Sequence, residues 1–451
     1  MSVEHPNILY FVCHDLGRHL GIYDALVQSP HLDAFAHSGT TFTQAYCNSP
    51  CCSPSRACAM TGRYAQSTGA IGLSHMGWSL PQSESTITDY LKAGGYETAH
   101  AGLAHERLPG ENAYEVEMEK EWDDWQAHRA VDHAIKYLES RDRSRPFYLN
   151  IGTQQVHDTA WHLADELYGG AVAPEDVHVP LQFPDTKATR CALGKFQAAI
   201  RFLDTQFQRL LDALEAHGYA DNTIVVFTTD HGMAGLRSKG TLYDHGTETA
   251  LMLRGPGIPA GKRFSDLIPN IDILPTLLEA CNLPVPEQVE GRSFWPLMQG
   301  RVYQPNDAIF IERNFHGQSK GGGVPGYEDR YDPVRSIRTR DFHYLLHCKP
   351  EANLHQWQVF EIPPEHRGDD SRFFSAWPAF DQPRGEEELY HVAVDPLENF
   401  DVAQRPEFRE IKQQLKERLL EWMTERQDFA LSGDVPERLH APGWGEFDQL
   451  S

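Results

Sequence analysis

A run near the N-terminus, C-N-S-P-C-C-S-P-S-R-A-C-A-M-T-G-R, combines a cysteine with residues that start a helix. Pro54 suits the first turn of a helix, and Ser53 or Ser55 can accept from its free N–H groups. This predicts Cys52 at the positive end of a helix dipole, with Arg56 one turn further on. Such a position lowers a thiol pKa and attracts an anion. Cys52 is therefore a candidate nucleophile.

Two predicted strands end in side chains that can bind a metal ion. Residues 7–13 and 223–229 are continuous, β-rich apolar runs, as expected of buried parallel strands. The side chains that directly follow them are His14, Asp15, Asp230 and His231. Open α/β sheets bind ligands at the carboxyl ends of their strands, so these groups are expected to meet beside Cys52. Carboxylates and imidazoles brought together there predict a metal site.

Composition limits the classes of partner. The chain has 451 residues, enough for one large α/β domain and a smaller one. Forty basic and 64 acidic residues give a formal net charge of -24. A chain this acidic gains nothing from a polyanionic nucleic acid, and it contains no basic run. An anionic substrate must instead be attracted by local cations in a pocket.

The cysteines and the N-terminus suggest a cellular compartment. The eight cysteines have no even, secreted-type spacing, and four of them crowd around the candidate nucleophile. The first predicted strand begins at Asn7, which leaves no room for a signal peptide. No apolar run approaches the length of a membrane span. We therefore expect a soluble protein of the reducing cytoplasm, with neither nucleic acid nor membrane as a partner.

The distal third of the chain has a different pattern from the rest. Residues 334–346 alternate polar and apolar side chains, which predicts an antiparallel strand pair, and residues 406–426 form an amphipathic helix expected to pack on it. A glycine-rich segment, 319–326, is a candidate linker or mobile pocket loop. We therefore predict a catalytic α/β domain at 1–325 and a smaller C-terminal α+β subdomain at 326–451.

The cysteine motif resembles a known signature. Cys52-Ser-Pro-Ser-Arg56, followed by Thr61-Gly-Arg63, is similar to the C-x-P-S-R and T-G-R pattern of type I sulfatases in the alkaline phosphatase superfamily. In that family the cysteine is oxidised after translation to formylglycine, whose hydrated aldehyde is the nucleophile. The resemblance thus implies a formylglycine-generating enzyme as a maturation partner.

Similar segments extend the resemblance over residues 7–426. The layout is most similar to the branch that contains heparan N-sulfatase and bacterial relatives. This implies a large mixed, mostly parallel sheet sandwiched by helices, followed by a smaller antiparallel sheet with a helix.

The resemblance also implies a metal site. The implied ligands of a divalent ion are Asp15, Cys52, Asp230 and His231. The corresponding family strand usually ends in two aspartates, and here His14 stands at the first of those positions, where a ring nitrogen can still bind metal. Calcium is expected first because most relatives use it, whereas imidazole ligands shift the preference towards Mn²⁺ or Zn²⁺.

Further matches imply the groups that hold a sulfate. Arg56, His157 and Lys239 are expected to supply positive charge or hydrogen bonds to its oxygens. His105 matches the histidine of the family pattern G-K-W-H and is the candidate acid for the leaving group. The lysine of that pattern is lost, because Leu103 stands in its place.

Another cation is expected to replace the lost lysine. The candidates in nearby loops are Arg107, His75 and His245. His75, His245 and Arg335 are predicted to contact the substrate, although a surface histidine is an equally good interpretation of His75.

Together these residues predict hydrolysis of a sulfate ester or a sulfamate, on a sulfated small molecule or saccharide. The alternative is a phosphonate or phosphodiester monoester hydrolase with the same nucleophile, which His231 and Leu103 both favour. A more remote alternative is a glycan-binding relative that keeps the fold without turnover.

Overall fold

A large sheet forms the centre of the molecule. The computed structural model describes residues 5–118, 122–235, 237–315, 331–350 and 384–439, and within them this sheet has eight strands. In spatial order they are β5 (Val116–Glu117), β4 (Glu97–Gly102), β6 (Phe147–Gly152), β1 (Asn7–Cys13), β7 (Thr223–Thr229), β8 (Leu251–Arg254), β2 (Thr40–Phe42) and β9 (Lys262–Phe264). The half from β5 to β7 is parallel, whereas β8 pairs antiparallel with both its neighbours. The predicted mixed, mostly parallel sheet is confirmed.

Helices cover both faces of this sheet, because its strands are buried on both sides. Leu9 and Phe11 of β1 pack into one core, and Ile8 and Tyr10 pack into the other. The first core is covered by α1 (Pro30–Ser38), α5 (Ala127–Ser140) and α6 (Lys187–Ala216). The second is covered by α2 (Cys52–Thr61), α4 (Ile87–Ala93) and α8 (Ile273–Ala280). The alternation of β1 therefore fixes the position of α2, which begins at the candidate nucleophile.

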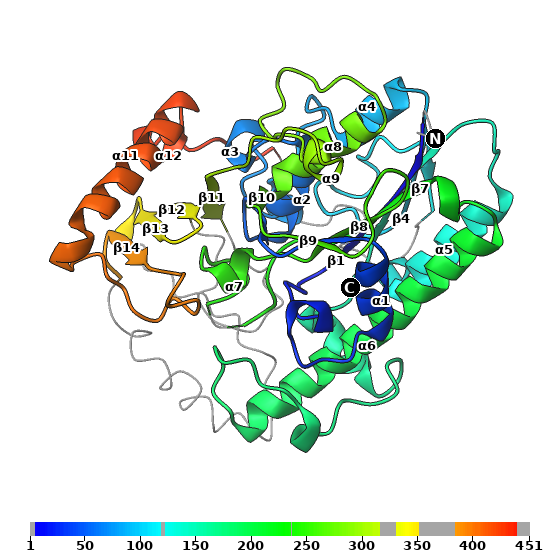
Figure 1. Ribbon diagram of the computed structural model, residues 1–451, viewed down its shortest axis with the longest axis horizontal. Helices are drawn as coiled ribbons and strands as arrows, with labels where there is room; N and C mark the ends of the chain where they lie inside the picture. The colour runs from blue at the N-terminus through cyan, green and yellow to red at the C-terminus, as the bar shows by residue number, and fades with distance from the viewer. Residues whose placement is uncertain (1–4, 119–121, 236, 316–330, 351–383, 440–451) are drawn as a thin grey trace.

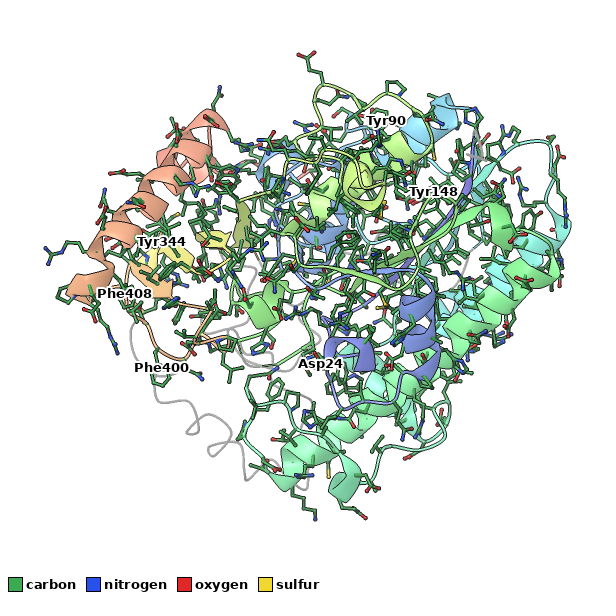
Figure 2. The ribbon with its side chains drawn as sticks, in the orientation of Figure 1. Asp24, Tyr90, Tyr148, Tyr344, Phe400 and Phe408 are labelled. Carbon is green, nitrogen blue, oxygen red and sulfur yellow. The ribbon has the colours of Figure 1, made fainter. Side chains whose placement is uncertain are left out.

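A smaller antiparallel sheet lies beside the large one, on the side of the molecule away from α5 and α6 (Figure 1). Its strands are β11 (Ala308–Phe315), β12 (Tyr331–Thr339), β13 (His343–His347) and β14 (Glu387–Tyr390). The helix α11 (Arg409–Glu425) covers one face, where Tyr344 packs with Leu419 (Figure 2). On the other face Ile311 and Val334 pack against Leu242 of the large domain. The small sheet is thus enclosed by α11 and the large domain.

The small sheet includes a strand that lies before the predicted domain boundary. We predicted the boundary at 325/326, but β11 pairs with β12, so the small sheet already begins at Ala308. A strand shows its own propensity in the sequence but not its partner, and this is the reason for the difference. The predicted strand pair within 334–346 and the helix within 406–426 are present as β12, β13 and α11. The glycine-rich segment 319–326 lies outside the described residues.

The remaining short elements connect these layers. They are β3 (Ala45–Tyr46), β10 (Ile268–Pro269), α3 (Ala65–Thr68), α7 (Asp244–Thr247), α9 (Trp295–Met298) and α12 (Phe429–Ser432), together with several short 3-10 helices. No helix in the described ranges is both long and apolar enough to cross a bilayer. The eight cysteines, all of which are described, are free thiols.

Candidate active site

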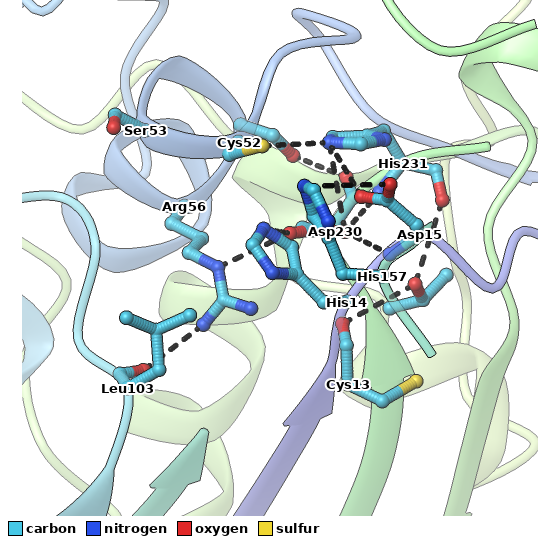
Figure 3. A network of polar contacts seen from close by, with 12 residues as sticks. Cys13, His14, Asp15, Cys52, Ser53, Arg56, Leu103, His157, Asp230 and His231 are labelled. Carbon is cyan, nitrogen blue, oxygen red and sulfur yellow. Dashed lines mark hydrogen bonds and ion pairs between the residues drawn. The ribbon is translucent and has the colours of Figure 1, made fainter. Parts of the chain in front are cut away.

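The ends of β1 and β7 meet the start of α2 and form one cluster (Figure 3). β1 and β7 are neighbours in register, so the side chains that follow Cys13 and Thr229 emerge at the same edge of the sheet. Their metal-binding atoms lie within 4.8 Å of one another, in a buried group made of His14, Asp15, Cys52, Asp230 and His231. The structure therefore brings together the five residues predicted to surround a metal ion.

Asp230 lies at the centre of this cluster. Its Oδ1 accepts from the backbone N–H of Asp15 at 3.0 Å, and its Oδ2 accepts from Arg56 Nε at 3.2 Å. His14 Nε2 is 3.0 Å from the same Oδ2, at hydrogen-bond length but without hydrogen-bond alignment. Burial would raise the pKa of Asp230, but Arg56, the bond from the Asp15 N–H and Lys239 lower it overall, so the carboxylate stays charged. A buried carboxylate with this charge is suited to a cation.

The donor set fits a divalent metal ion. Burial lowers the pKa of His14 well below its usual value, and it also lowers that of His231. Both imidazoles are therefore neutral, as metal-binding histidines must be. His14 Nδ1 is buried without a hydrogen-bond partner in the described chain, and His231 Nδ1 contacts Gly232 O at 2.8 Å, which leaves Nε2 facing Cys52 Sγ at 3.3 Å. Two carboxylates and two imidazoles suit Mn²⁺ or Zn²⁺ better than an all-oxygen site would.

Lys239 joins the cluster from the chain that follows β7. Its Nζ donates to both oxygens of Asp15, at 3.0 and 2.8 Å, and lies 2.8 Å from His157 Nε2. Burial would lower the pKa of Lys239, but Asp15 raises it above its usual value, so the ammonium is charged. A metal ion at Asp15 would share this carboxylate with the ammonium, which places positive charge beside Cys52.

Asp158, which we did not predict, contacts the far side of His157. Asp158 Oδ1 lies 2.7 Å from His157 Nδ1, and His157 Nε2 faces Lys239. A carboxylate on one ring nitrogen orients the ring and fixes which nitrogen carries hydrogen. Although burial opposes it, His157 lowers the pKa of Asp158 well below its usual range. The sequence offered only one signal for this role, the adjacency of Asp158 to His157.

The environment of Cys52 differs from the prediction in two respects. Cys52 is the first residue of α2, as predicted, but Cys51 is the N-cap and makes no side-chain capping bond. The two predicted capping serines are used elsewhere, because Ser53 Oγ donates to Ser74 Oγ and Ser55 Oγ donates to Asp230 O. Burial raises the pKa of the Cys52 thiol instead of lowering it. The cost of burying a thiolate raises the pKa of Cys52 by more than the helix dipole and Lys239 lower it.

Arg56 reaches from α2 towards the strand end at Leu103. Its Nη1 donates to Leu103 O at 3.2 Å, while Nη2 is buried without a partner among the described residues. Gly152, at the end of β6, makes this approach possible, because a Cβ there would lie 1.9 Å from Leu103 O and 3.2 Å from Nη1. Leu103, which stands where the family has a lysine, thus orients Arg56 through its backbone carbonyl.

His105 and His75 form one wall of the site. Their rings stack at a centroid distance of 5.7 Å, and the His105 ring is 5.8 Å from that of His14. Burial, followed by the nearby His75, lowers the pKa of His105 well below its usual value. His105 is therefore neutral until an anion arrives beside it, since a nearby negative charge favours the protonated form. Of the predicted substitutes for the lysine, the structure places His75 at this wall.

The structure does not bring Arg107, His245 or Arg335 into the cluster. Arg107 donates to the backbone carbonyls of loop residues 80, 81 and 84. His245 lies on α7, where burial lowers its pKa to about 4. Arg335 is fully buried in β12, and its five N–H groups donate to the acceptors Asp428 Oδ1 and Oδ2, Asn314 Oδ1, Arg313 O and Val334 O. Arg335 has no donor left for a substrate, which corrects its predicted role.

Two family models match the chain. The model described as Sulfatase matches residues 6–283, and the model described as N-sulphoglucosamine sulphohydrolase, C-terminal, matches residues 232–348. The human N-sulphoglucosamine sulphohydrolase is 25% identical over 96% of this chain and 93% of its own length.

Solved structures share the fold. One, described as a complex with its substrate D-glucosamine-2-N,6-O-disulfate, has a TM-score of 0.70 and 18% identity over 94% of this chain and 98% of its own. The phosphonate monoester hydrolase of Agrobacterium radiobacter has a TM-score of 0.67 and 19% identity over 95% of this chain and 97% of its own. At these identities a structure establishes the fold alone. The family model, which covers more than half of the chain, settles the family: this chain belongs to the sulfatases and is a sulfuric ester hydrolase.

Proposed function

We propose that this protein hydrolyses sulfate esters or sulfamates of a saccharide, with position 52 converted to formylglycine and a divalent metal ion beside it. One observation carries the proposal: Cys52, at the start of α2, faces His231 Nε2 at 3.3 Å in a buried group that also contains Asp15 and Asp230. The similarity to human N-sulphoglucosamine sulphohydrolase, and to a solved structure in complex with D-glucosamine-2-N,6-O-disulfate, supports the choice of substrate class.

The same residues suggest where formylglycine and a metal ion would be held. Formylglycine at position 52 would supply an oxygen nucleophile, and a divalent ion held by His14, Asp15, Asp230 and His231 would supply positive charge. We propose calcium first, on the precedent of the family, with Mn²⁺ or Zn²⁺ favoured by the two imidazoles. A formylglycine-generating enzyme would be required for maturation.

The residues of the chain would bind and orient the sulfuryl group. The positive charge of Lys239 would attract its oxygens, the unpartnered Arg56 Nη2 would donate to them, and His157 would lie beside them. Burial of these groups excludes water, which strengthens their attraction for the developing charge. His105 would hold the proton for the leaving group, because a bound anion raises the pKa that burial lowers.

Two measurements on one preparation test this proposal. Peptide mass spectrometry of protein co-produced with a formylglycine-generating enzyme should find an aldehyde at position 52, and Cys52→Ala should have no turnover. A panel of sulfated sugars, sulfamates and phosphodiesters should show the fastest turnover on a sulfated sugar or sulfamate. Full activity of protein with an unmodified thiol would contradict the nucleophile. Full activity after chelation, with metal content confirmed as nil, would contradict the metal site.

The second candidate is a phosphonate or phosphodiester monoester hydrolase. Leu103 in place of a lysine and the imidazole of His231 favour it, and the Agrobacterium enzyme shares the fold. The same substrate panel distinguishes the two candidates. If a phosphodiester is turned over faster than any sulfate or sulfamate, the phosphohydrolase replaces the sulfatase as the proposed function. Binding of sulfated glycans without any turnover would indicate the remote alternative, a glycan-binding relative without catalytic activity.

The cellular location is also a proposal. The sequence-based expectation of a cytoplasmic protein agrees with eight free thiols. Fractionation of the producing cells would test it, and recovery of the protein outside the cytoplasm would contradict it.

A further inference from the structure

The chain that carries Lys239 crosses the boundary between the large domain and the small sheet. It runs from residue 237 to α7 (Asp244–Thr247). On the large-domain side, Lys239 N donates to Met233 O at 3.0 Å and Gly240 N donates to Pro50 O at 2.7 Å. Pro50 lies two residues before Cys52, so the ammonium-bearing residue is tied by its backbone to the nucleophile segment.

The small sheet contacts the other side of this chain. Arg313 of β11 donates through Nη1 to Gly240 O at 2.9 Å. Arg237 Nη2 donates to Glu398 O at 2.6 Å, and its guanidinium carbon lies 3.7 Å from the Tyr243 ring centroid. The Tyr243 hydroxyl in turn donates to Glu388 Oε2 at 2.9 Å. Side chains or backbone of the C-terminal subdomain thus contact the chain on both sides of Lys239.

The strongest of these contacts is a buried ion pair between Arg338 of β12 and Asp244 of α7. Arg338 Nε donates to both carboxylate oxygens of Asp244, at 2.9 and 3.1 Å, and Nη2 donates to Oδ2 at 2.8 Å. Glu398 Oε2 accepts from the backbone N–H of Asp244 at 2.6 Å, while its Oε1 lies 2.6 Å from His343 Nδ1. Asp244, His343 and Glu398 resemble a metal-binding group, but Arg338 already neutralises Asp244.

Close packing connects this ion pair to Lys239. Gly246, two residues after Asp244, lies so near the preceding chain that a Cβ on it would be 2.4 Å from both Ser238 O and Thr241 O. Packing this close leaves α7 no room to shift without moving the backbone on both sides of Lys239. Arg338, on the small sheet, holds α7 in place. A shift of α7 would therefore also move the backbone that carries the Lys239 ammonium.

We propose that Arg338 is a positioning residue that sets the place of the anion-binding ammonium of Lys239 through Asp244 and α7. This rests on the proposed function, in which Lys239 holds the sulfuryl group. A displacement of about 1 Å in a group that binds the reacting atoms can cost about a hundredfold in rate. The small sheet is then part of the catalytic architecture, although Arg338 itself touches neither the nucleophile nor the cluster around it.

The test compares two isosteric changes at matched buried ion pairs. Asp244→Asn weakens the hold on Arg338, and Asp428→Asn weakens the hold on Arg335, three residues earlier on the same strand. Arg338→Lys weakens the ion pair with Asp244 by changing its cationic partner. For each purified protein we would measure the melting temperature, the deuterium exchange of peptides covering residues 237–248, kcat and KM, and competitive inhibition by inorganic sulfate.

We expect Asp244→Asn and Arg338→Lys to speed exchange in residues 237–248, to lower kcat/KM at least tenfold and to weaken sulfate inhibition by a similar factor. Asp428→Asn should lower the melting temperature at least as much, but change exchange there and kcat/KM less than twofold. Equal effects of the two Asp→Asn changes on kcat/KM would overturn the proposal, as would faster exchange with unchanged kcat/KM. If the unaltered protein turned over no sulfate or sulfamate, the proposed function would fail. The positioning role would fail as well if Asp244→Asn also left the deuterium exchange of residues 237–248 unchanged.

Discussion

Arg56 and Arg335 are both buried arginines paired with an aspartate, yet the two regions around them are built differently. In the small sheet, all five N–H groups of Arg335 donate to protein acceptors. In the active site, Arg56 donates to Asp230 and to Leu103 O, and Nη2 has no partner among the described residues. A buried donor without a partner costs stability. At Arg56 this cost lies where a bound anion could remove it.

A second pair of titratable residues, Glu388 and His14, shows the same contrast. Glu388 accepts from Tyr243 and Tyr390 and pairs with His347. In the active site, His14 Nδ1 has no partner in the described chain, although the residue is buried. In these two comparisons, Arg335 and Glu388 of the small sheet are fully paired, whereas Arg56 and His14 of the active site each keep a buried nitrogen without a partner among the described residues. Burial alone does not separate the two classes, because both are withdrawn from water.

The largest expected effect is on catalysis at Arg56. Arg56→Lys keeps the positive charge but replaces the planar guanidinium with a single ammonium nitrogen. The variant therefore loses the separate donors Nη1 and Nη2. We expect kcat/KM to fall about a thousandfold, because a lost donor to the developing charge costs that much in a water-free site. Steady-state kinetics on a sulfated sugar would measure it, with the melting temperature as control. A fall of less than tenfold would show that the unpartnered Nη2 has no catalytic use.

At Arg335 we expect the opposite result. Arg335→Met removes one partner of a buried ion pair and leaves Asp428 uncompensated, which should cost about 3–5 kcal/mol in the free energy of unfolding. The kcat/KM of the remaining folded protein should stay within twofold. Urea unfolding at 25 °C, followed by fluorescence, would measure the first quantity. A raised KM with unchanged stability would restore the substrate-binding role predicted from the sequence.

The complete pairing of Glu388 predicts a pH dependence of stability. Burial would raise its pKa, but the bonds with His347 and Tyr390 lower it to about 2, against about 4.3 in an unfolded chain. A lowered pKa contributes stability that is present above pH 4.3 and lost as the pH falls towards 2, about 3 kcal/mol in all. The stability difference between the protein and Glu388→Gln should therefore shrink as urea unfolding is repeated from pH 5 to pH 3. A constant difference would contradict the pairing.

His75 tests the replacement of the missing lysine. His75→Phe keeps a ring to stack on His105 but removes the ring nitrogens. If His75 supplies the lost positive charge, kcat/KM should fall about a hundredfold on sulfated sugars and less on small aryl sulfates, whose leaving groups need less help. Arg107→Lys is the matched control, because Arg107 bonds only to the backbone carbonyls of residues 80, 81 and 84 among the contacts described. Equal effects of the two changes would exclude His75 as the replacement.

The smallest effect is expected at Asp158. Asp158→Ala removes the carboxylate from His157 Nδ1 and leaves the ring its contacts with Thr159 and Lys239, and loss of such an orienting partner typically costs about tenfold to a hundredfold in activity. Asp158→Asn keeps an acceptor oxygen for Nδ1 and should recover most of the loss. Comparing kcat and KM of the two variants checks this. Identical losses would show that the negative charge of Asp158, and not its orienting bond, is what matters.

Most of the active site could be predicted from the sequence alone, because strand ends and a helix start are local features. A β-branched run followed by an acid and a histidine marks the carboxyl end of a buried strand, which was sufficient for Asp15, Asp230 and His231. The motif around Cys52 likewise fixed where α2 begins. These patterns also predicted the class of the large sheet, since continuous apolar strands require cover on both faces.

The tertiary structure alone decided what the buried charges do. Nothing in the sequence near Arg335 shows that Asp428, from α12's N-terminus 93 residues away, would take its guanidinium, or that β11 would pair with β12. The thiol pKa of Cys52 also depends on burial by segments distant in the sequence, which overrides the local helix dipole. Pairing partners and desolvation are long-range properties, so local patterns located the candidate active site, while only the folded chain determined which partners each buried charge has.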